Sequence, residues 1–215
     1  MIRTTDQLID RIAQELVWRR KELTELKALV EESHGKLRSR VVIRAAVALL
    51  YAHWEGFVKK ASAYYLEYVA SHRLPYSRLA PNFVGLTLRS KFHSLGASTK
   101  ISAGNELADF FCNSLNQQSS LPYREGIDTK SNLSSKALLD ILDTLGLDHT
   151  HFQTRLQFID SNLVNPRNHI AHGEELSLTT EEYLALHHDV LTLIETYRNE
   201  VENSSITKRY ERAST

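Results

Sequence analysis

Four side chains that could act together on a phosphate lie near the C-terminal end of the chain: Arg167, Asn168, His169 and His172. A guanidinium can bind a phosphate through two parallel hydrogen bonds, and an imidazole can accept or donate a proton near neutral pH. Asn168 and His172 are four residues apart and share a helix face, whereas Arg167 and His172 are about 140° apart on an ideal helix. The pattern predicts a phosphate site. It requires the arginine to reach around, the helix to bend, or a second copy of the protein to complete the site.

The residues that flank this motif predict a new helical turn. Asn165 is suited to an N-cap, Pro166 to the first helical position, and Gly173 to a stop directly after His172. Arg167 would then lie near a helix N-terminus, where unpaired N–H groups and the helix dipole favour anions. We therefore expect the motif to open a short helix with an anion-binding start.

Helical periodicity dominates the rest of the 215-residue chain, which has only 8 glycines and 4 prolines. Capping boxes at Thr4 with Gln7 and at Thr179 with Glu182 mark the starts of the first and last helices. The helices are expected at about residues 4–33, 36–71, 82–95, 103–115, 133–145, 150–163 and from 180 onward, with a long loop at 116–132. The fold class predicted is an all-α helical bundle.

The organisation expected is a single helical domain over residues 1–202. The N-terminal helix at 4–33 is added to a core of about residues 36–200. A polar stretch at 203–215 is expected to form a flexible tail.

The composition excludes several classes of protein. Lysine plus arginine number 26 and aspartate plus glutamate number 26, whereas a protein that coats nucleic acid through bulk charge is strongly basic. Any nucleic-acid function must therefore rest on a local site. The one cysteine, Cys112, excludes an intrachain disulfide and favours the cytosol; in its apolar surroundings we expect it to be buried as a small hydrophobic residue.

Neither a signal peptide nor a membrane span is predicted. The N-terminal residues run directly into an amphipathic pattern with charges throughout. The longest apolar run, residues 41–52, is interrupted by Arg44 and is too short to cross a bilayer. We expect a cytoplasmic protein with no membrane contact.

The motif Arg167 to His172 resembles the Arg-x4–6-His motif of the HEPN superfamily, in which a polar residue such as Asn168 usually follows the arginine. The stretches at 51–58 (Tyr-Ala-His-Trp-Glu-Gly-Phe-Val) and 168–173 (Asn-His-Ile-Ala-His-Gly) resemble the RiboL-PSP-associated HEPN subfamily, and the resemblance covers about residues 36–200. It implies a four- or five-helix bundle that forms a homodimer, with the two motifs facing each other across a cleft.

The resemblance also implies an activity. Catalytic members are metal-independent endoribonucleases of toxin–antitoxin, abortive-infection and CRISPR-associated systems, and toxins of this family usually have an antitoxin partner encoded beside them. In this chain His172 would serve as general base or acid, Arg167 would hold the RNA phosphate, and Asn168 would orient the phosphate or His172. The RNA 2′-OH would attack and leave 2′,3′-cyclic phosphate and 5′-OH ends. No cofactor and no metal are expected.

Further residues are candidates for substrate binding. Glu55 lies in an apolar, aromatic stretch, where a carboxylate is costly unless paired, so we expect an arginine partner such as Arg167 or else a position at the edge of the bundle. His169 points away from the motif face and suits the surface or an interface. A basic stripe with steps of four residues could follow an RNA backbone or could simply be a solvated face: Lys36, Arg40 and Arg44.

Other interpretations of the same residues remain open. His172 could merely cap a helix C-terminus. A metal site could use His169 with His172, His149 with His151, or the adjacent His187 and His188, although no cysteine pair supports zinc. Members that lack cleavage activity bind RNA, a nucleotide or a protein instead, and a purely helical adaptor would need no role for the motif at all.

Overall fold

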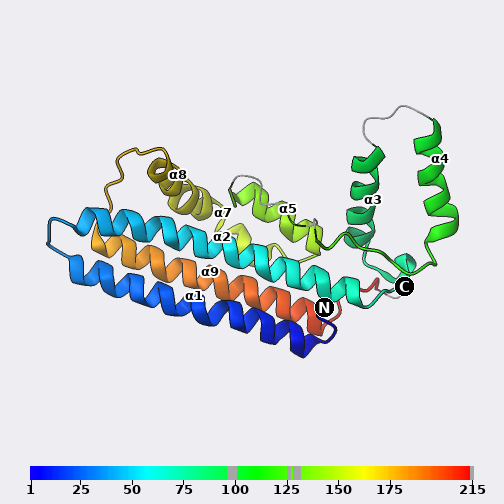
Figure 1. Ribbon diagram of the computed structural model, residues 1–215, viewed down its shortest axis with the longest axis horizontal. Helices are drawn as coiled ribbons and strands as arrows, with labels where there is room; N and C mark the ends of the chain where they lie inside the picture. Colours follow the sequence, from blue (N-terminus) through cyan, green and yellow to red (C-terminus); the bar gives the residue numbers. More distant parts are fainter. Residues whose placement is uncertain (96–100, 125–126, 128–131, 214–215) are drawn as a thin grey trace.

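Three long helices lie side by side and form the body of the molecule (Figure 1). They are α1 (Thr5–Ser33), α2 (Ser39–Ser71) and α9 (Thr180–Ile206). The computed structural model describes residues 1–95, 101–124, 127 and 132–213, and within these residues the chain has no strand. Helix α9 contacts both α1 and α2, so the first, second and last long helices share one core, as expected for an all-α bundle.

Helix α2 is the central helix of this core. It contacts α1, α9, α5 and α8, which explains why its sequence is apolar nearly all round. Trp54 of α2 is fully buried and meets Tyr197 of α9 edge to face, with ring centroids 6.2 Å apart. Among the described residues α2 is the one helix long and apolar enough to cross a membrane. Half of its most apolar stretch is buried inside the protein, as in the core helix of a soluble bundle.

The shorter helices lie on one side of α2 and at one end of the body. Helices α3 (Pro81–Leu95) and α4 (Ile101–Asp109) project from the end, with α4 continuing as the π-helix η2 (Phe110–Ser114) (Figure 1). Helix α5 (Ser135–Leu145) packs on α2 and α3 and stops at Gly146, whose φ is +66°. After α5 come α6 (Thr150–Gln153), α7 (Leu156–Phe158), the π-helix η3 (Ile159–Val164) and α8 (Asn165–Ala171).

The predicted capping box is complete at Thr179 but only half formed at Thr4, where Gln7 Oε1 accepts the Arg3 N–H at 2.8 Å instead of the Thr4 N–H. The Thr4 hydroxyl accepts the Gln7 N–H at 3.2 Å, and Thr179 and Glu182 form the complete reciprocal box that opens α9. The helix expected at 36–71 begins at Ser39.

The expectation of a flexible tail after residue 203 is wrong. Helix α9 continues to Ile206, and the following segment returns to the body: Ala80 N–H donates to the Tyr210 carbonyl at 2.8 Å, and Arg212 N–H donates to the Arg78 carbonyl at 2.8 Å. The Tyr210 ring is buried and stacks on His72, with centroids 5.2 Å apart. One aromatic side chain anchors an otherwise polar segment.

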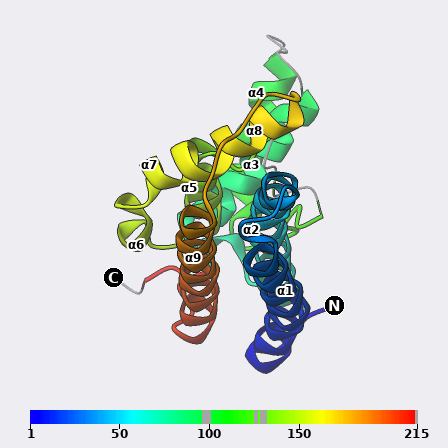
Figure 2. The same cartoon turned by 90° about the vertical axis from the view of Figure 1, so that its left-hand side faces the viewer.

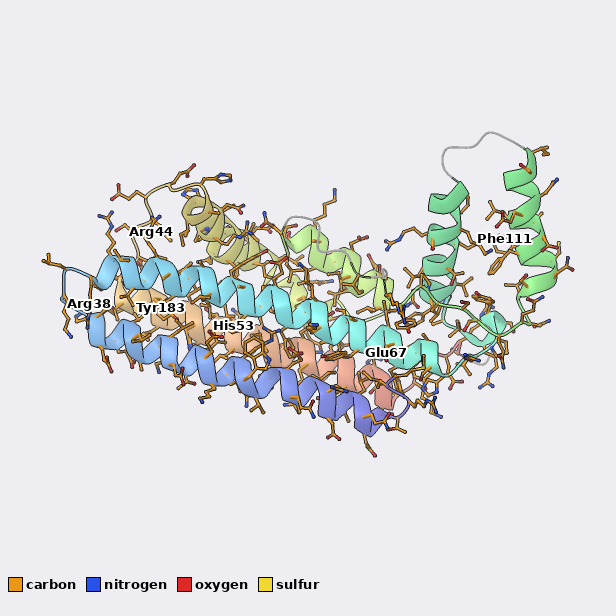
Figure 3. All side chains as sticks on the ribbon, viewed as in Figure 1. Arg38, Arg44, His53, Glu67, Phe111 and Tyr183 are labelled. Carbon is orange, nitrogen blue, oxygen red and sulfur yellow. The ribbon has the colours of Figure 1, made fainter. Side chains whose placement is uncertain are left out.

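The expectation of a buried Cys112 is also wrong, because its thiol side chain is exposed. Phe110 takes the buried position of this π-helix and packs edge to face against Tyr76, with centroids 5.0 Å apart. The segment belongs to the projecting α4 arm, which has too little covering structure to bury both side chains (Figure 3 labels the neighbouring, exposed Phe111).

Candidate phosphate-binding site

The motif does not open a new helix. The N-cap position of α8 is Val164, with φ −67° and ψ −50°, so the chain passes from η3 into α8 without a break. Asn165 therefore does not act as an N-cap, and Pro166 lies inside a continuous helix. The wide π turns that come directly before it accommodate a residue that lacks an N–H and whose ring crowds the preceding turn. The predicted anion-binding helix start at Arg167 is thus absent, and any phosphate must be held by side chains.

The predicted stop at Gly173 is present. Gly173 has φ +75°, its N–H donates to the Ile170 carbonyl at 3.1 Å, and the Glu174 N–H donates to the His169 carbonyl at 2.8 Å. These two bonds form a Schellman motif, which fixes the end of the helix. His172 is the C-cap residue and its side chain is exposed. The imidazole is therefore carried at a defined place on the surface.

Arg167 is half-buried and is held by neutral groups. Its Nη1 donates to Asn168 Oδ1 at 3.0 Å, and its guanidinium carbon lies 5.4 Å from the centre of the Tyr51 ring on α2. Asn168 Oδ1 also accepts from Asn132 Nδ2 at 3.2 Å. The structure therefore brings Arg167 and Asn168 together, and the Asn168 amide orients the arginine rather than the imidazole of His172. Helix α8 packs against α2, so this contact joins the two helices, and Figure 2, which looks nearly along α2, shows α8 running obliquely to it.

Tyr51 and Asn132 are site residues that the motif alone does not reveal. The Tyr51 hydroxyl accepts the Leu133 N–H at 2.6 Å. The pKa of Tyr51 is raised to about 12, chiefly by burial; the Leu133 hydrogen bond and the charge of Arg167 oppose this rise, and the nearby Glu55 carboxylate contributes to it. The sequence feature that could have pointed to Tyr51 is its place in an apolar helix, where a buried tyrosine needs a hydrogen-bond partner for its hydroxyl. Asn132 gave none, because its role depends on where a loop returns.

Glu55 lies beside Tyr51 on the same helix, and its ion pair is with Lys59 at 3.0 Å. Its side chain is only 15% exposed, and this ion pair is with a lysine, whereas the expected partner was an arginine such as Arg167. Lys59 lies one turn further along the same helix, and the Glu55 carboxylate and the Arg167 guanidinium both act on the pKa of Tyr51, in opposite directions. Glu55 therefore borders the site through Tyr51.

The loop after the motif covers two residues of the predicted basic stripe. Arg44 donates from Nη1 to the Glu174 carbonyl at 2.5 Å, and Arg40 forms an ion pair with Glu175 (Figure 3 shows Arg44 on the α2 side that faces this loop). His169 Nδ1 lies 3.4 Å from Glu174 Oε2, and both side chains are more than half exposed. The stripe is thus partly occupied by the protein's own acidic loop.

Lys36 belongs to a separate, open groove at the turn between α1 and α2. The groove has a volume of about 560 Å³ and is bordered by Lys36, Arg40 and Glu181. Lys36 lies in the turn before α2 and Arg40 lies in the first turn of α2, and residues 177–179 of the loop that leaves α8 also border the groove. Lys36 is therefore close to, but not part of, the cluster around Arg167.

The histidines considered as metal ligands are scattered. His187 is buried and its Nε2 lies 3.1 Å from the Leu23 carbonyl, whereas His149 pairs with Asp143 at 3.1 Å. Across the described part of the chain, no three His, Cys, Asp or Glu side chains gather in a way that could hold a metal ion.

The described residues form an all-α bundle in which one short helix, α8, carries Arg167 and ends at His172. A sequence model of the RiboL-PSP-HEPN family matches residues 14–203, and the chain belongs to this family. The match begins within α1, so it extends beyond the stretch 36–200 expected from the motifs. Comparison with curated proteins and with solved structures gave no match.

Proposed function

We propose that this protein is a metal-independent endoribonuclease that acts as a homodimer, with Arg167 and His172 from both copies around one RNA phosphodiester. The observation that carries the proposal is the state of Arg167: a half-buried guanidinium held by an amide and an aromatic ring, on the helix that ends at an exposed imidazole. Neutral contacts leave its charge available for a phosphate.

The chemistry needs only these groups and the RNA. One His172 imidazole removes the proton from the 2′-OH, the O2′–P bond forms, and the P–O5′ bond breaks as a second imidazole protonates O5′. Arg167 stabilises the charge that builds on the phosphoryl oxygens. The products are a 2′,3′-cyclic phosphate and a 5′-OH end. DNA lacks the 2′-OH and would be bound without being cut.

We infer a second copy because the reaction uses one imidazole as base and another as acid, and each chain supplies one His172. In a single chain Arg167 is turned onto α2, while His172 lies five residues on, at the helix end. The outer face of α2 offers a surface for the second copy. It carries exposed apolar side chains at steps of three and four residues, and an exposed apolar stripe of this kind marks an interaction surface: Val41, Ala45, Leu49 and Ala52. Leu37, which is also exposed, continues this stripe into the turn before α2.

The alternative function is a non-catalytic HEPN module that binds RNA, a nucleotide or a protein. The observation that favours it is that Asn168 binds Arg167 and not His172, since a binding site needs the guanidinium but not a paired acid and base. A helical adaptor that dimerises through α2 needs neither side chain.

Purified protein incubated with mixed RNA in excess EDTA tests these functions. The proposal predicts cleavage that survives EDTA and is lost in both Arg167→Ala and His172→Ala, while the surface controls Arg11→Ala and His188→Ala cut normally. RNA binding without cleavage, lost in Arg167→Ala alone, would establish the binding module instead. Unchanged behaviour of both motif variants would leave only the adaptor.

The biological setting we propose is a toxin or defence system in the cytosol, in which a neighbouring gene encodes an antitoxin protein. Expression of the wild-type chain should then arrest growth, and His172→Ala should relieve the arrest. Normal growth on expression of a chain that cuts RNA in vitro would contradict the toxin role while leaving the nuclease in place.

A further inference from the structure

Tyr51 presents a fixed aromatic surface to Arg167. The residue is 1% exposed, its backbone lies in the middle of α2, and its hydroxyl is tied to the Leu133 N–H at 2.6 Å. A ring held at both ends cannot turn away from the guanidinium, whose carbon lies 5.4 Å from the ring centre. The contact therefore restricts the arginine rather than the tyrosine.

We infer that Tyr51 is a positioning residue for the phosphate site, which acts by holding the Arg167 guanidinium in one orientation before RNA arrives. The inference rests on the proposed function of Arg167 as the phosphate ligand. A long arginine side chain loses conformational freedom when it binds, and a guanidinium that is already ordered loses less.

The chemistry of the ring suits this task better than a carboxylate would. A carboxylate would compete with phosphate for the same N–H groups, whereas the face of an aromatic ring attracts the cation without occupying them. Asn168 takes one donor of the guanidinium, at 3.0 Å from Nη1. The remaining donors are the ones a phosphate could use.

The ring and the hydroxyl of Tyr51 have separable roles. Tyr51→Phe keeps the aromatic face but leaves the Leu133 N–H without its acceptor, so it should destabilise the fold more than it disturbs Arg167. Tyr51→Leu removes the face as well. If Tyr51 only supports the fold, RNA binding should follow stability in both variants. If it positions Arg167, binding should follow the presence of the ring.

The experiment measures binding of a fluorescein-labelled, single-stranded RNA that carries 2′-O-methyl groups and so resists cleavage by 2′-OH attack. Wild type, Tyr51→Phe and Tyr51→Leu are compared, each with Arg167 present and with Arg167→Ala, and the free energy of unfolding of every variant is measured by urea denaturation. Tyr65→Leu serves as the matched control, because Tyr65 is a fully buried tyrosine of the same helix that packs on Phe83 instead.

The inference predicts that Tyr51→Leu weakens binding about tenfold, the upper range for a partly desolvated cation–π contact, while Tyr51→Phe stays within about twofold of wild type. The effect of Tyr51→Leu should vanish in the Arg167→Ala background, since a residue that acts through Arg167 has nothing left to position. Tyr65→Leu should destabilise the protein without changing the affinity.

Equal losses in Tyr51→Phe and Tyr51→Leu would overturn the inference, and so would a Tyr51→Leu effect that persists without Arg167. RNA binding that does not depend on Arg167 at all would overturn both the inference and the proposed function. Binding that shows the Tyr51–Arg167 dependence in a protein that cuts no unmodified RNA would support the inference while removing the nuclease.

Discussion

Two arginines pack against aromatic rings on either side of α2, and they differ in what neutralises their charge. On the α1 side, the Arg19 guanidinium carbon lies 4.3 Å from the Trp18 ring centre and Nη2 binds the Glu15 carboxylate at 3.0 Å. On the α8 side, Arg167 lies over Tyr51 and binds the amide of Asn168.

The difference separates a structural cation from one that can take a ligand. Arg19 is 5% exposed, and Gly56 leaves room for it, since a Cβ there would lie 3.1 Å from Nη1. Burial lowers the pKa of Arg19, and Glu15 opposes that shift. Arg167 has the same kind of ring contact, and among the described residues the side chain that binds its guanidinium is the amide of Asn168. We conclude that Arg19 joins two helices, whereas Arg167 is prepared for an outside anion.

The largest effect on stability should come from Arg19→Ala, which breaks the buried ion pair and leaves the Glu15 carboxylate largely buried without its arginine. We expect the free energy of unfolding to fall by about 3 kcal/mol or more. Arg167→Ala should cost about 1 kcal/mol or less, because it removes only neutral contacts. Urea denaturation of both variants checks this, and equal losses would remove the distinction between the two arginines.

The next largest effect should be that Arg167→Lys slows RNA cleavage. A lysine keeps the charge but lacks the planar fork that binds a phosphate through two parallel bonds. We expect cleavage in EDTA to slow by about 100-fold, as for loss of a donor to the transition state. Arg19→Lys is the matched control and should cleave at the wild-type rate per folded molecule. Wild-type activity in Arg167→Lys would show that charge alone suffices.

The stability of the contact between α1 and α2 around His53 should also depend on pH. Burial lowers the pKa of His53, although Glu22, 3.0 Å away, opposes the shift and Arg19 adds to it. The unfolded chain then binds the proton more readily, so stability should decline as pH falls below about 6.5, by no more than about 1.4 kcal/mol per pH unit for one proton.

Urea titrations from about pH 7.5 to about pH 5 measure this slope. His72 and His187 also have pKa values lowered by burial and contribute in the same direction. His53→Gln should therefore reduce the slope without abolishing it, and an unchanged slope would contradict the assignment.

The smallest effect should come from Arg40→Ala, which breaks an exposed pair with Glu175. We expect stability to change by less than about 1 kcal/mol, and less at high salt. If the basic stripe follows an RNA backbone, the same variant should reduce the salt dependence of RNA binding by about one phosphate contact. If Arg40→Ala lowered the free energy of unfolding as much as Arg19→Ala does, the Arg40–Glu175 pair would be essential to the stability of the fold.

The parts of the fold that the sequence predicts are those set by local chemistry. Thr4 and Thr179 cap the first and last helices as expected, and Gly173 ends the helix that carries the motif. These signals act within a few residues, so one sequence is enough to read them.

The parts that were missed depend on contacts between distant segments. Asn165 and Pro166 imitate a helix start, but packing of η3 and α8 against α2 keeps the helix continuous. Tyr51 becomes a site residue only because α8 returns to the middle of α2, and Tyr210 anchors the chain end only because the Ala80 turn lies beside it.

Mixing wild-type and His172→Ala subunits tests the central claim, that two copies build one site, most directly. After subunit exchange at equal amounts, with the wild-type concentration held constant, the account predicts that RNA cleavage in EDTA falls to about half, because dimers with a single imidazole lack either the acid or the base. Arg11→Ala subunits, added in the same way, should leave the rate unchanged. Undiminished cleavage in the His172→Ala mixture would contradict the account, since each copy would then cut RNA by itself.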